Sequence, residues 1–336
     1  MTSYPHSRPA TVTPLWRSLA APGSVPAFIV RRIGRLLVSF AVLVTAAFLM
    51  IRIVPGDPVR NALGIQASQS VVEARREALG LNLPLWDQYL GFWRGLFTGD
   101  LGTSFGSQLP VSQIIAQRLP ATLELAGLAI VAVLVLAIPI GLAAAALTRG
   151  GRRRGLELGY TSVSGVLTAL PEFIIGVGLI YLFAVQTQLL PVAGRSSPAS
   201  YILPVAALAL GNIAAMSRIV RAEALSVLDR DYIRTARSKR MPARRLYLRH
   251  ALPNLVTSSM TIGGLIFGGL IAGTVLVENI FAWPGLGQVI VSSVQSNDFP
   301  LSQAIVVIYG SLVLLITLLV DVLLVVLDPR STMREA

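Results

Sequence analysis

Residues that could do covalent, redox or phosphoryl chemistry are scarce in this chain. There is no cysteine, which excludes disulfides, thiolate metal sites and cysteine nucleophiles. The two histidines, His6 and His250, lie far apart in sequence. The single lysine, Lys239, follows Ser238 without the glycine-rich turn of a phosphate-binding loop. We therefore expect no catalytic residue, no metal site and no cofactor-binding residue in this chain, and no ATP hydrolysis by it.

A few acidic residues stand inside or at the edges of long apolar segments: Glu124, Glu172, Glu278 and Asp321. An ionisable group in a bilayer costs about 2.5–3.5 kcal/mol on insertion scales, so it usually faces protein or water. Glu172 follows Pro171 near the middle of its apolar segment and is our candidate for lining a transport pathway. Pairing of Glu172 with a neighbouring polar group or the backbone is the equally weighted alternative. For the other three we expect packing or interface roles.

Apolar segments of bilayer-crossing length dominate the chain. Hydrophobic residues make up 54% of the 336 and charged residues only 13%, and runs of about 20 apolar residues recur. We predict an all-α, polytopic membrane protein with about six transmembrane helices. They are expected near 29–52, 119–147, 160–185, 203–221, 255–279 and 303–327.

The net charge of +12 raises the question of nucleic-acid binding. Most of the 28 arginine and lysine residues, however, fall in the N-terminal segment, in 148–159, in 218–254 and near the C-terminus. These segments alternate with the expected outer ones, and basic residues accumulate in cytoplasmic loops. We expect both termini to be cytoplasmic, the bilayer to be the partner, and no nucleic acid to be bound.

The same patterns divide the chain into segments. We expect a disordered cytoplasmic tail over 1–28, a first transmembrane helix over 29–54 and an external helical segment over 55–117. A five-helix domain over 118–328 and a cytoplasmic C-terminus over 329–336 follow. Arginines precede the first helix as in a signal peptide, but its apolar stretch is too long, so we expect a retained anchor. The external segment is expected to cap the membrane surface, with a substrate gate as the alternative.

The most basic loop, 222–254, has too regular a pattern for a mere linker. One face of an expected helix carries apolar residues at helical spacing, namely Leu225, Leu228, Tyr232 and Ala236, and another carries Arg230, Arg234 and Arg237. Met241-Pro242 should interrupt this helix, and a second short helix should run from Ala243 to Leu252-Pro253. A solvated positive loop would explain the charge but not the apolar face. We expect a helix–turn–helix that fits a groove on another protein.

At this loop the chain resembles the permeases of type I ABC importers, in the branch that takes up dipeptides, oligopeptides, nickel or glutathione. Their coupling loop reads Glu-Ala-Ala-x3-Gly-x9-Ile-x-Leu-Pro. Here Tyr232-Ile233-Arg234-Thr235-Ala236-Arg237-Ser238-Lys239-Arg240 falls on the first half, and His250-Ala251-Leu252-Pro253 on the end, with matching spacing. Arg240 stands where the family has glycine, which places the geometry of that turn in question.

Other segments extend the resemblance over about residues 29–330. Pro55-Gly56-Asp57-Pro58, Gly99-Asp100-Leu101-Gly102, Val277-Glu278-Asn279-Ile280-Phe281 with Pro284-Gly285-Leu286-Gly287, and Leu327-Asp328-Pro329-Arg330 match the branch in order and spacing. The resemblance implies the type I importer permease fold in a bacterial plasma (inner) membrane. It also implies a second homologous permease, two ABC ATPase subunits that hold ATP and Mg, and an extracytoplasmic substrate-binding protein.

The resemblance gives the loop residues a role in coupling to the ATPases. Leu225, Leu228, Tyr232, Ile233 and Ala236 are expected to supply apolar docking. Arg234, Thr235, Arg237 and Arg240 would face ATPase carboxylates or carbonyls, and Leu252-Pro253 would end the second helix.

The function implied is a permease subunit that forms half of a pathway for peptides, by alternating access driven by ATP. Nickel or glutathione is the alternative substrate. An ATP-independent secondary carrier or channel is the rival from another class, and it should show an intramembrane charge network or repeated halves. A membrane scaffold would transport nothing.

Overall fold

The fold is given by a computed structural model of the chain. It describes residues 25–53, 58–64, 66–78, 80–151, 153–239, 241–242, 245–247 and 252–327. The predicted tail over 1–28 therefore lies almost wholly outside the described residues, as does the C-terminus from 328 onward.

The described chain is helical almost throughout. The first four helices are α2 (Val25–Ile53), α3 (Pro58–Leu63), α4 (Gln69–Ala78) and α5 (Leu85–Thr98). The central helices are α6 (Val111–Thr148), α7 (Arg154–Ala169), α8 (Glu172–Leu179), α9 (Ile202–Leu228) and α10 (Asp231–Ser238). The last three are α12 (Leu252–Ile280), α13 (Leu286–Gln295) and α14 (Phe299–Leu327). A π-helical stretch, η2 (Ile180–Gln186), continues α8, and short 3₁₀ turns occupy Arg149–Gly151 and Pro198–Tyr201.

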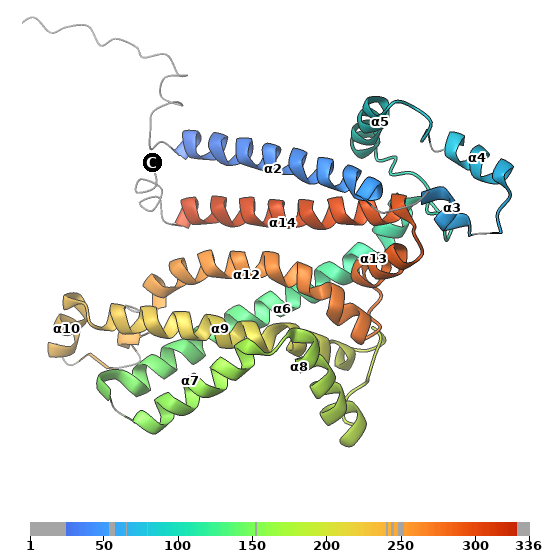
Figure 1. Cartoon of the computed structure of the whole chain (residues 1–336). Helices are drawn as coiled ribbons and strands as arrows, with labels where there is room; N and C mark the ends of the chain where they lie inside the picture. The colour runs from blue at the N-terminus through green and yellow to red at the C-terminus, as the bar shows by residue number, and fades with distance from the viewer. Residues whose placement is uncertain are drawn as a thin grey trace, which may run out of the picture.

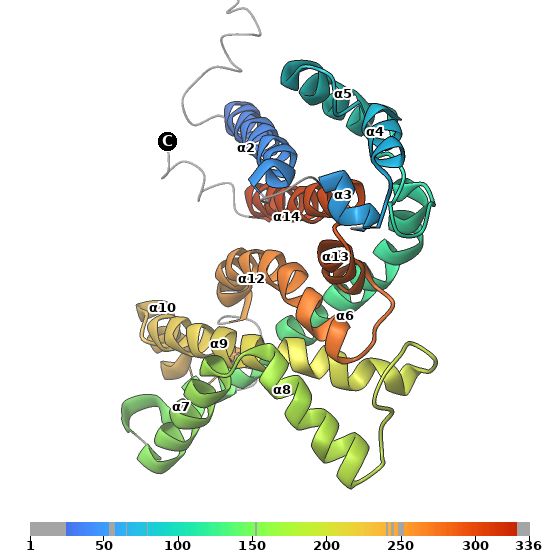
Figure 2. The same cartoon turned by 45° about the vertical axis from the view of Figure 1, so that its right-hand side comes forward.

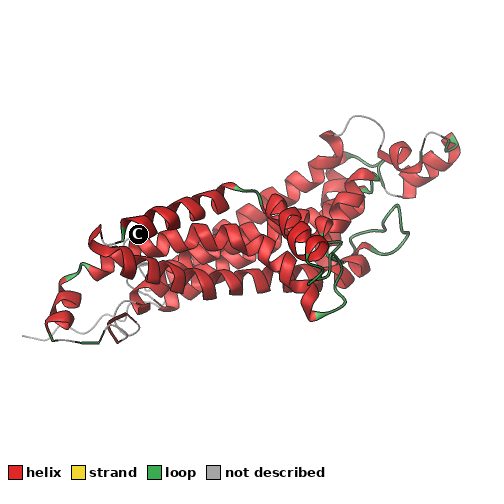
Figure 3. Ribbon diagram, turned by 90° about the horizontal axis from the view of Figure 1, so that it is seen from below, coloured by secondary structure: helices red, strands yellow, loops and turns green. Residues whose placement is uncertain are grey.

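Helices α6, α9 and α12 form the centre of the bundle. They pack along one another, with α7 and α8 against α9 and the pair α2–α14 against α12 (Figure 1). The largest apolar cluster lies between them and includes Leu125, Leu208, Met216, Leu270 and Phe281, each at most 1% exposed. Figure 3 shows the long helices lying roughly parallel, with irregular segments gathered at the ends.

The two ends of the bundle differ. The start of α2, the end of α14 and helix α10 share one end, at the left in Figure 1, while α3, α4, α5 and α13 lie at the other. At the α10 end, Arg32 of α2 forms an ion pair of 2.9 Å with Asp321 of α14, which gives Asp321 the packing role expected of it. The arrangement matches an even number of crossings with both termini on one side.

Within the described residues, four helices are long and apolar enough to span a membrane, and five are if the bent pair α7–α8 counts as one span. In α12 the apolar stretch Ile266–Ile280 is shorter. Each of the six segments predicted from the sequence is helical, which confirms the all-α membrane fold. Their ends differ, because α6 begins at Val111 and α9 continues to Leu228, beyond the ends at 119 and 221 expected from apolar content alone.

The third predicted helix, over 160–185, is not continuous. Helices α7 and α8 meet at an angle of 102°, and Figure 2 shows them diverging beside α9. Leu170 has extended backbone angles (φ −79°, ψ 125°) and Pro171 follows with φ −58° and ψ 144°. Proline disfavours helical geometry in the residue before it, so Pro171 ends α7 and starts a new helix in another direction.

Candidate coupling loop and translocation site

The cytoplasmic loop predicted from the sequence is built on the end of α9. Helix α9 runs through Leu225 and Leu228 before the chain turns at Asp229-Arg230 into α10. Helix α10 ends at Ser238, three residues before Met241-Pro242, in agreement with the predicted interruption. Helix α10 therefore follows the core helix α9 after a turn of two residues.

The apolar face of this loop points inward. Leu228, Ile233 and Ala236 belong to a cluster that we call the inner cluster, in which α10 packs on the ends of α6, α9 and α12. Its buried members are Leu142, Ala145, Ala224, Val227, Leu228, Ile233, Ala236, Leu246 and Leu255, with Leu225 partly buried beside them. Leu228 and Ile233 are fully buried and Ala236 is 8% exposed. In this structure the side chains of Leu228, Ile233 and Ala236 pack against the chain's own helices, and the apolar docking expected of them stays a prediction.

Tyr232 and Thr235, in contrast, are on the outer face. Tyr232 is 40% exposed, and Thr235 and Arg230 are exposed as well. Arg240 lies outside the described residues, and so do the side chains of Arg234, Arg237 and Pro253. The roles predicted for those residues remain predictions.

Leu252 and Pro253 open α12 instead of closing the second short helix. A proline is tolerated in the first turn of a helix, where its missing N–H has no intrahelical acceptor. Of the second short helix, the described residues show a helical segment at 245–247.

Polar contacts join α10 and the loop before α7 to the bundle. Arg149, at the end of α6, forms an ion pair with Asp229 at the turn into α10. Arg221 of α9 donates to Thr148 Oγ1 at 2.9 Å and to Glu157 Oε1 of α7 at 2.5 Å. These contacts join the turn before α10 to the end of α6, and α9 to α6 and α7.

Glu172 opens α8 at the bend in the third span. Its side chain is half-buried and lies against α12, where a Cβ atom added to Gly273 would come within 2.9 Å of both carboxylate oxygens. No hydrogen bond or ion pair joins this carboxylate to another residue of the described chain. The sequence alternative, a local polar partner for Glu172, is not seen there.

Glu278 lies on α12 five residues after Gly273, near the end of the helix. It is fully buried, and Gly287 N donates to its Oε2 at 2.6 Å. Nearby, Trp283 Nε1 donates to Ala121 O at 3.0 Å and Leu286 N to Thr122 Oγ1 at 2.9 Å. These bonds pin the Pro284-Gly285-Leu286-Gly287 turn to α6, which is the packing role expected of Glu278.

Glu124 takes part in a more exposed contact at the same end. Arg195 Nη2 lies 2.6 Å from its carboxylate, and the Tyr201 hydroxyl accepts from Arg195 Nε at 3.0 Å. The Tyr201 hydroxyl and the Glu124 carboxylate both raise the pKa of Arg195, the former more strongly. Glu124 thus has the interface role expected from the sequence.

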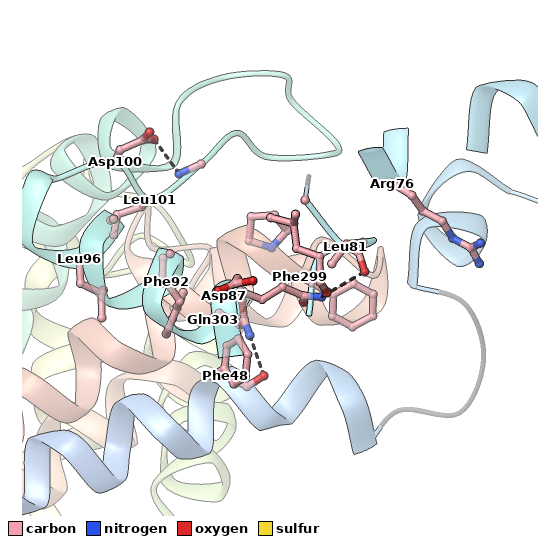
Figure 4. Close-up of a pocket in the computed structure, with 18 of the residues that line it drawn as sticks. Phe48, Arg76, Leu81, Asp87, Phe92, Leu96, Asp100, Leu101, Phe299 and Gln303 are labelled. Carbon is pink, nitrogen blue, oxygen red and sulfur yellow. Dashed lines mark hydrogen bonds between the residues drawn. The ribbon is translucent and has the colours of Figure 1, made fainter. Parts of the chain in front are cut away.

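A cavity of about 770 Å³ lies beneath the external segment (Figure 4). Helix α5, the turn around Leu81 and the start of α14 at Phe299 line it. Gln303 Nε2, from α14, donates to Ala47 O of α2 at 2.8 Å, and Gln88 Nε2 donates to Leu81 O at 3.1 Å. The first bond joins α14 to α2, and the second lies within the external segment. The cap stays a prediction, and the sequence gave no sign of the cavity, which forms between segments far apart in the chain.

The bent third span, the α6–α9–α12 core and the loop carried on α9 belong to a bundle that contains helices long and apolar enough to span a membrane. Residues 137–333 match the binding-protein-dependent transport system inner membrane component family, and residues 25–126 match its N-terminal region. The chain belongs to this family and is a multi-pass permease subunit of an ABC importer in the inner membrane.

The chain aligns with individual relatives over nearly its whole length. This chain is 36% identical over 303 residues to the glutathione transport system permease protein GsiC of Pectobacterium atrosepticum, and the alignment covers 90% of this chain and 97% of that one. It is 34% identical over 304 residues to the dipeptide transport system permease protein DppB of Lactococcus lactis subsp. cremoris, covering 90% and 98%. The fold resembles that in the inward-facing MetNI methionine ABC transporter, with a TM-score of 0.56 and 16% identity over 64% of this chain and 97% of that one.

Proposed function

We propose that this chain forms half of the translocation pathway of an ATP-driven importer for small peptides, with α10 as the element through which the ATPases act. The observation that carries the proposal is the seating of α10. It is fastened by the inner cluster to three core helices, and it leaves Tyr232 and Thr235 facing outward. A helix attached in this way would transmit motion between a docked partner and the core helices, in both directions.

The substrate class follows from the relatives. GsiC is named for glutathione and DppB for dipeptides, both short molecules with a peptide bond and a free amino group. Similarity of about a third over 90% of the chain to both supports a peptide substrate, and glutathione is the favoured specific alternative.

The partners follow from the same reading. ATP and Mg would be held by two ABC ATPase subunits, and a second, homologous permease would supply the other half of the pathway. An extracytoplasmic binding protein would deliver the peptide to the face that carries α5 and the cavity beneath it. The end with α10 and both termini would then be cytoplasmic.

Co-expression with candidate partner subunits from the same organism tests the proposal. The complex should purify with two ATPases and a second permease. In liposomes its ATP hydrolysis should rise when the binding protein and alanyl-alanine or glutathione are added together. A chain that purifies alone and transports these compounds without ATPases would contradict the proposal.

A further inference from the structure

Glu172 differs from four other acidic residues that touch the spanning helices. Asp321 is paired with Arg32, Glu157 with Arg221 and Glu124 with Arg195. Glu278 accepts a backbone hydrogen bond from Gly287. Among the described residues, the Glu172 carboxylate has no such partner, although it lies within a membrane span.

The backbone around Glu172 is also interrupted. The third span turns by 102° at Leu170-Pro171, directly before Glu172. Irregular backbone at membrane depth is tolerated where it is buried in protein or lines a water-filled cavity. Transporters commonly bind their substrates at such discontinuous helices, near the middle of the membrane.

Two features allow a charge to remain at this position. Glu172 is in the first turn of α8, where the positive end of the helix dipole favours a negative side chain. Gly273 of α12 leaves the space that the carboxylate occupies, since a Cβ atom there would lie 2.9 Å from both carboxylate oxygens. The carboxylate therefore has room beside α12, and no described residue uses its hydrogen-bonding capacity.

We propose that Glu172 binds the cationic group of the substrate, an ammonium in the case of a peptide, as the substrate passes the bend between α7 and α8. This inference rests on the proposed function, because it takes a peptide as the cargo. An unpaired carboxylate in a low-dielectric pathway attracts an ammonium strongly and forms a charge-assisted hydrogen bond with it.

The first experiment compares Glu172→Gln and Glu172→Asp in the complete importer, reconstituted in liposomes with its binding protein. Uptake of labelled alanyl-alanine should fall about tenfold or more in Glu172→Gln, because the charge is lost while the shape is kept. Glu172→Asp keeps the charge and should lose far less. The control is Glu73→Gln on the exposed helix α4, which should transport like the wild type.

The second experiment uses the absence of cysteine from this chain. Glu172→Cys introduces its only thiol, and a sulfonatoethyl methanethiosulfonate reagent then restores a negative charge there. That reagent should recover uptake, whereas the aminoethyl reagent, which adds a positive charge, should not. Alanyl-alanine with the binding protein and ATP should slow modification of the thiol. The wild-type complex treated in parallel reports any effect on partner cysteines.

The outcomes separate this inference from the proposed function. If the wild-type complex imports no peptide, the proposed function fails. If the wild type imports and Glu172→Gln imports equally well, only the inference fails. Equal losses in Glu172→Gln and Glu172→Asp would also overturn it, since they would show a requirement for shape. Charge rescue without substrate protection would overturn it too, by assigning Glu172 to a contact with the second permease.

Discussion

Gly141 of α6 lies at a close contact between α6 and α9. A Cβ atom added there would sit 2.5 Å from Ser217 O and 2.7 Å from the Val220 Cβ on α9. Gly127, on the same helix α6, would meet nothing within 4 Å. The contact between α6 and α9 thus requires the absence of a side chain at Gly141 but not at Gly127. Small residues allow membrane helices to approach closely in this way.

We expect Gly141→Ala to lower the stability of the purified protein by about 1–3 kcal/mol, the usual range for overpacking. Gly127→Ala is the matched control and should be neutral or slightly stabilising, because alanine favours helix over glycine. Thermal unfolding in detergent, followed by tryptophan fluorescence, compares the two variants. Equal midpoints would show that the two helices are less tightly packed than described here.

The sequence alone singled out Glu172 as a candidate for lining the transport pathway. Its place beside Pro171 in an apolar segment was enough to mark it as a pathway candidate. The bend and the contact with Gly273 could not be predicted, because periodicity reports apolar content along the chain and not the direction of successive helices.

At the scale of the element, α10 has two faces with different tasks. Ile233 is fully buried in the inner cluster and its neighbour Tyr232 is 40% exposed. Adjacent residues on a helix point about 100° apart. The inward residue should determine whether α10 stays attached, and the outward one whether a partner binds.

We therefore expect Ile233→Ala to destabilise the protein by about 2–5 kcal/mol, through the cavity it leaves. Tyr232→Ala should lower the unfolding midpoint less than Ile233→Ala does, since Tyr232 is 40% exposed and Ile233 is fully buried. Tyr232→Ala should also reduce co-purification of the ATPases. A stable Ile233→Ala variant, or unaltered ATPase binding by Tyr232→Ala, would reverse the assignment of the two faces.

The sequence predicted a helix that ends before Met241-Pro242, but it predicted neither the break at Asp229-Arg230 nor the orientation of α10. The helical spacing, the break at Met241-Pro242 and the apolar stripe were all visible in the residues. A stripe reports only that one face is buried, however, and either the chain's own bundle or a partner could bury it. Leu228 and Ala236 pack against the bundle. This packing depends on where the ends of α6 and α12 lie in space, which the sequence pattern does not report.

For the whole molecule, ATP-driven import requires one fixed orientation of the chain in the membrane. The end with α10 should face the cytoplasm and the end with α5 and Arg195 the exterior, because most basic residues lie at the former. Ser238, at the end of α10, and Ser196, beside Arg195, are both exposed.

Single cysteines introduced at these two serines test the orientation, with no background from other cysteines in the chain. A membrane-impermeant maleimide added to intact cells or spheroplasts should label Ser196→Cys and spare Ser238→Cys. Inside-out vesicles should give the opposite pattern. Labelling of Ser238→Cys from outside would place α10 on the wrong side for ATPases.

The central claim is that ATP hydrolysis on partner subunits drives uptake through α10. The most direct measurement is the ratio of alanyl-alanine imported to ATP hydrolysed by the reconstituted complex, for the wild type and for Arg234→Glu/Arg237→Glu. Charge reversal at these two positions of α10 should lower this ratio severalfold while the variant still inserts and assembles with the second permease. Uptake that an ion gradient sustains without ATPases, or an unchanged ratio in the variant, would contradict the account.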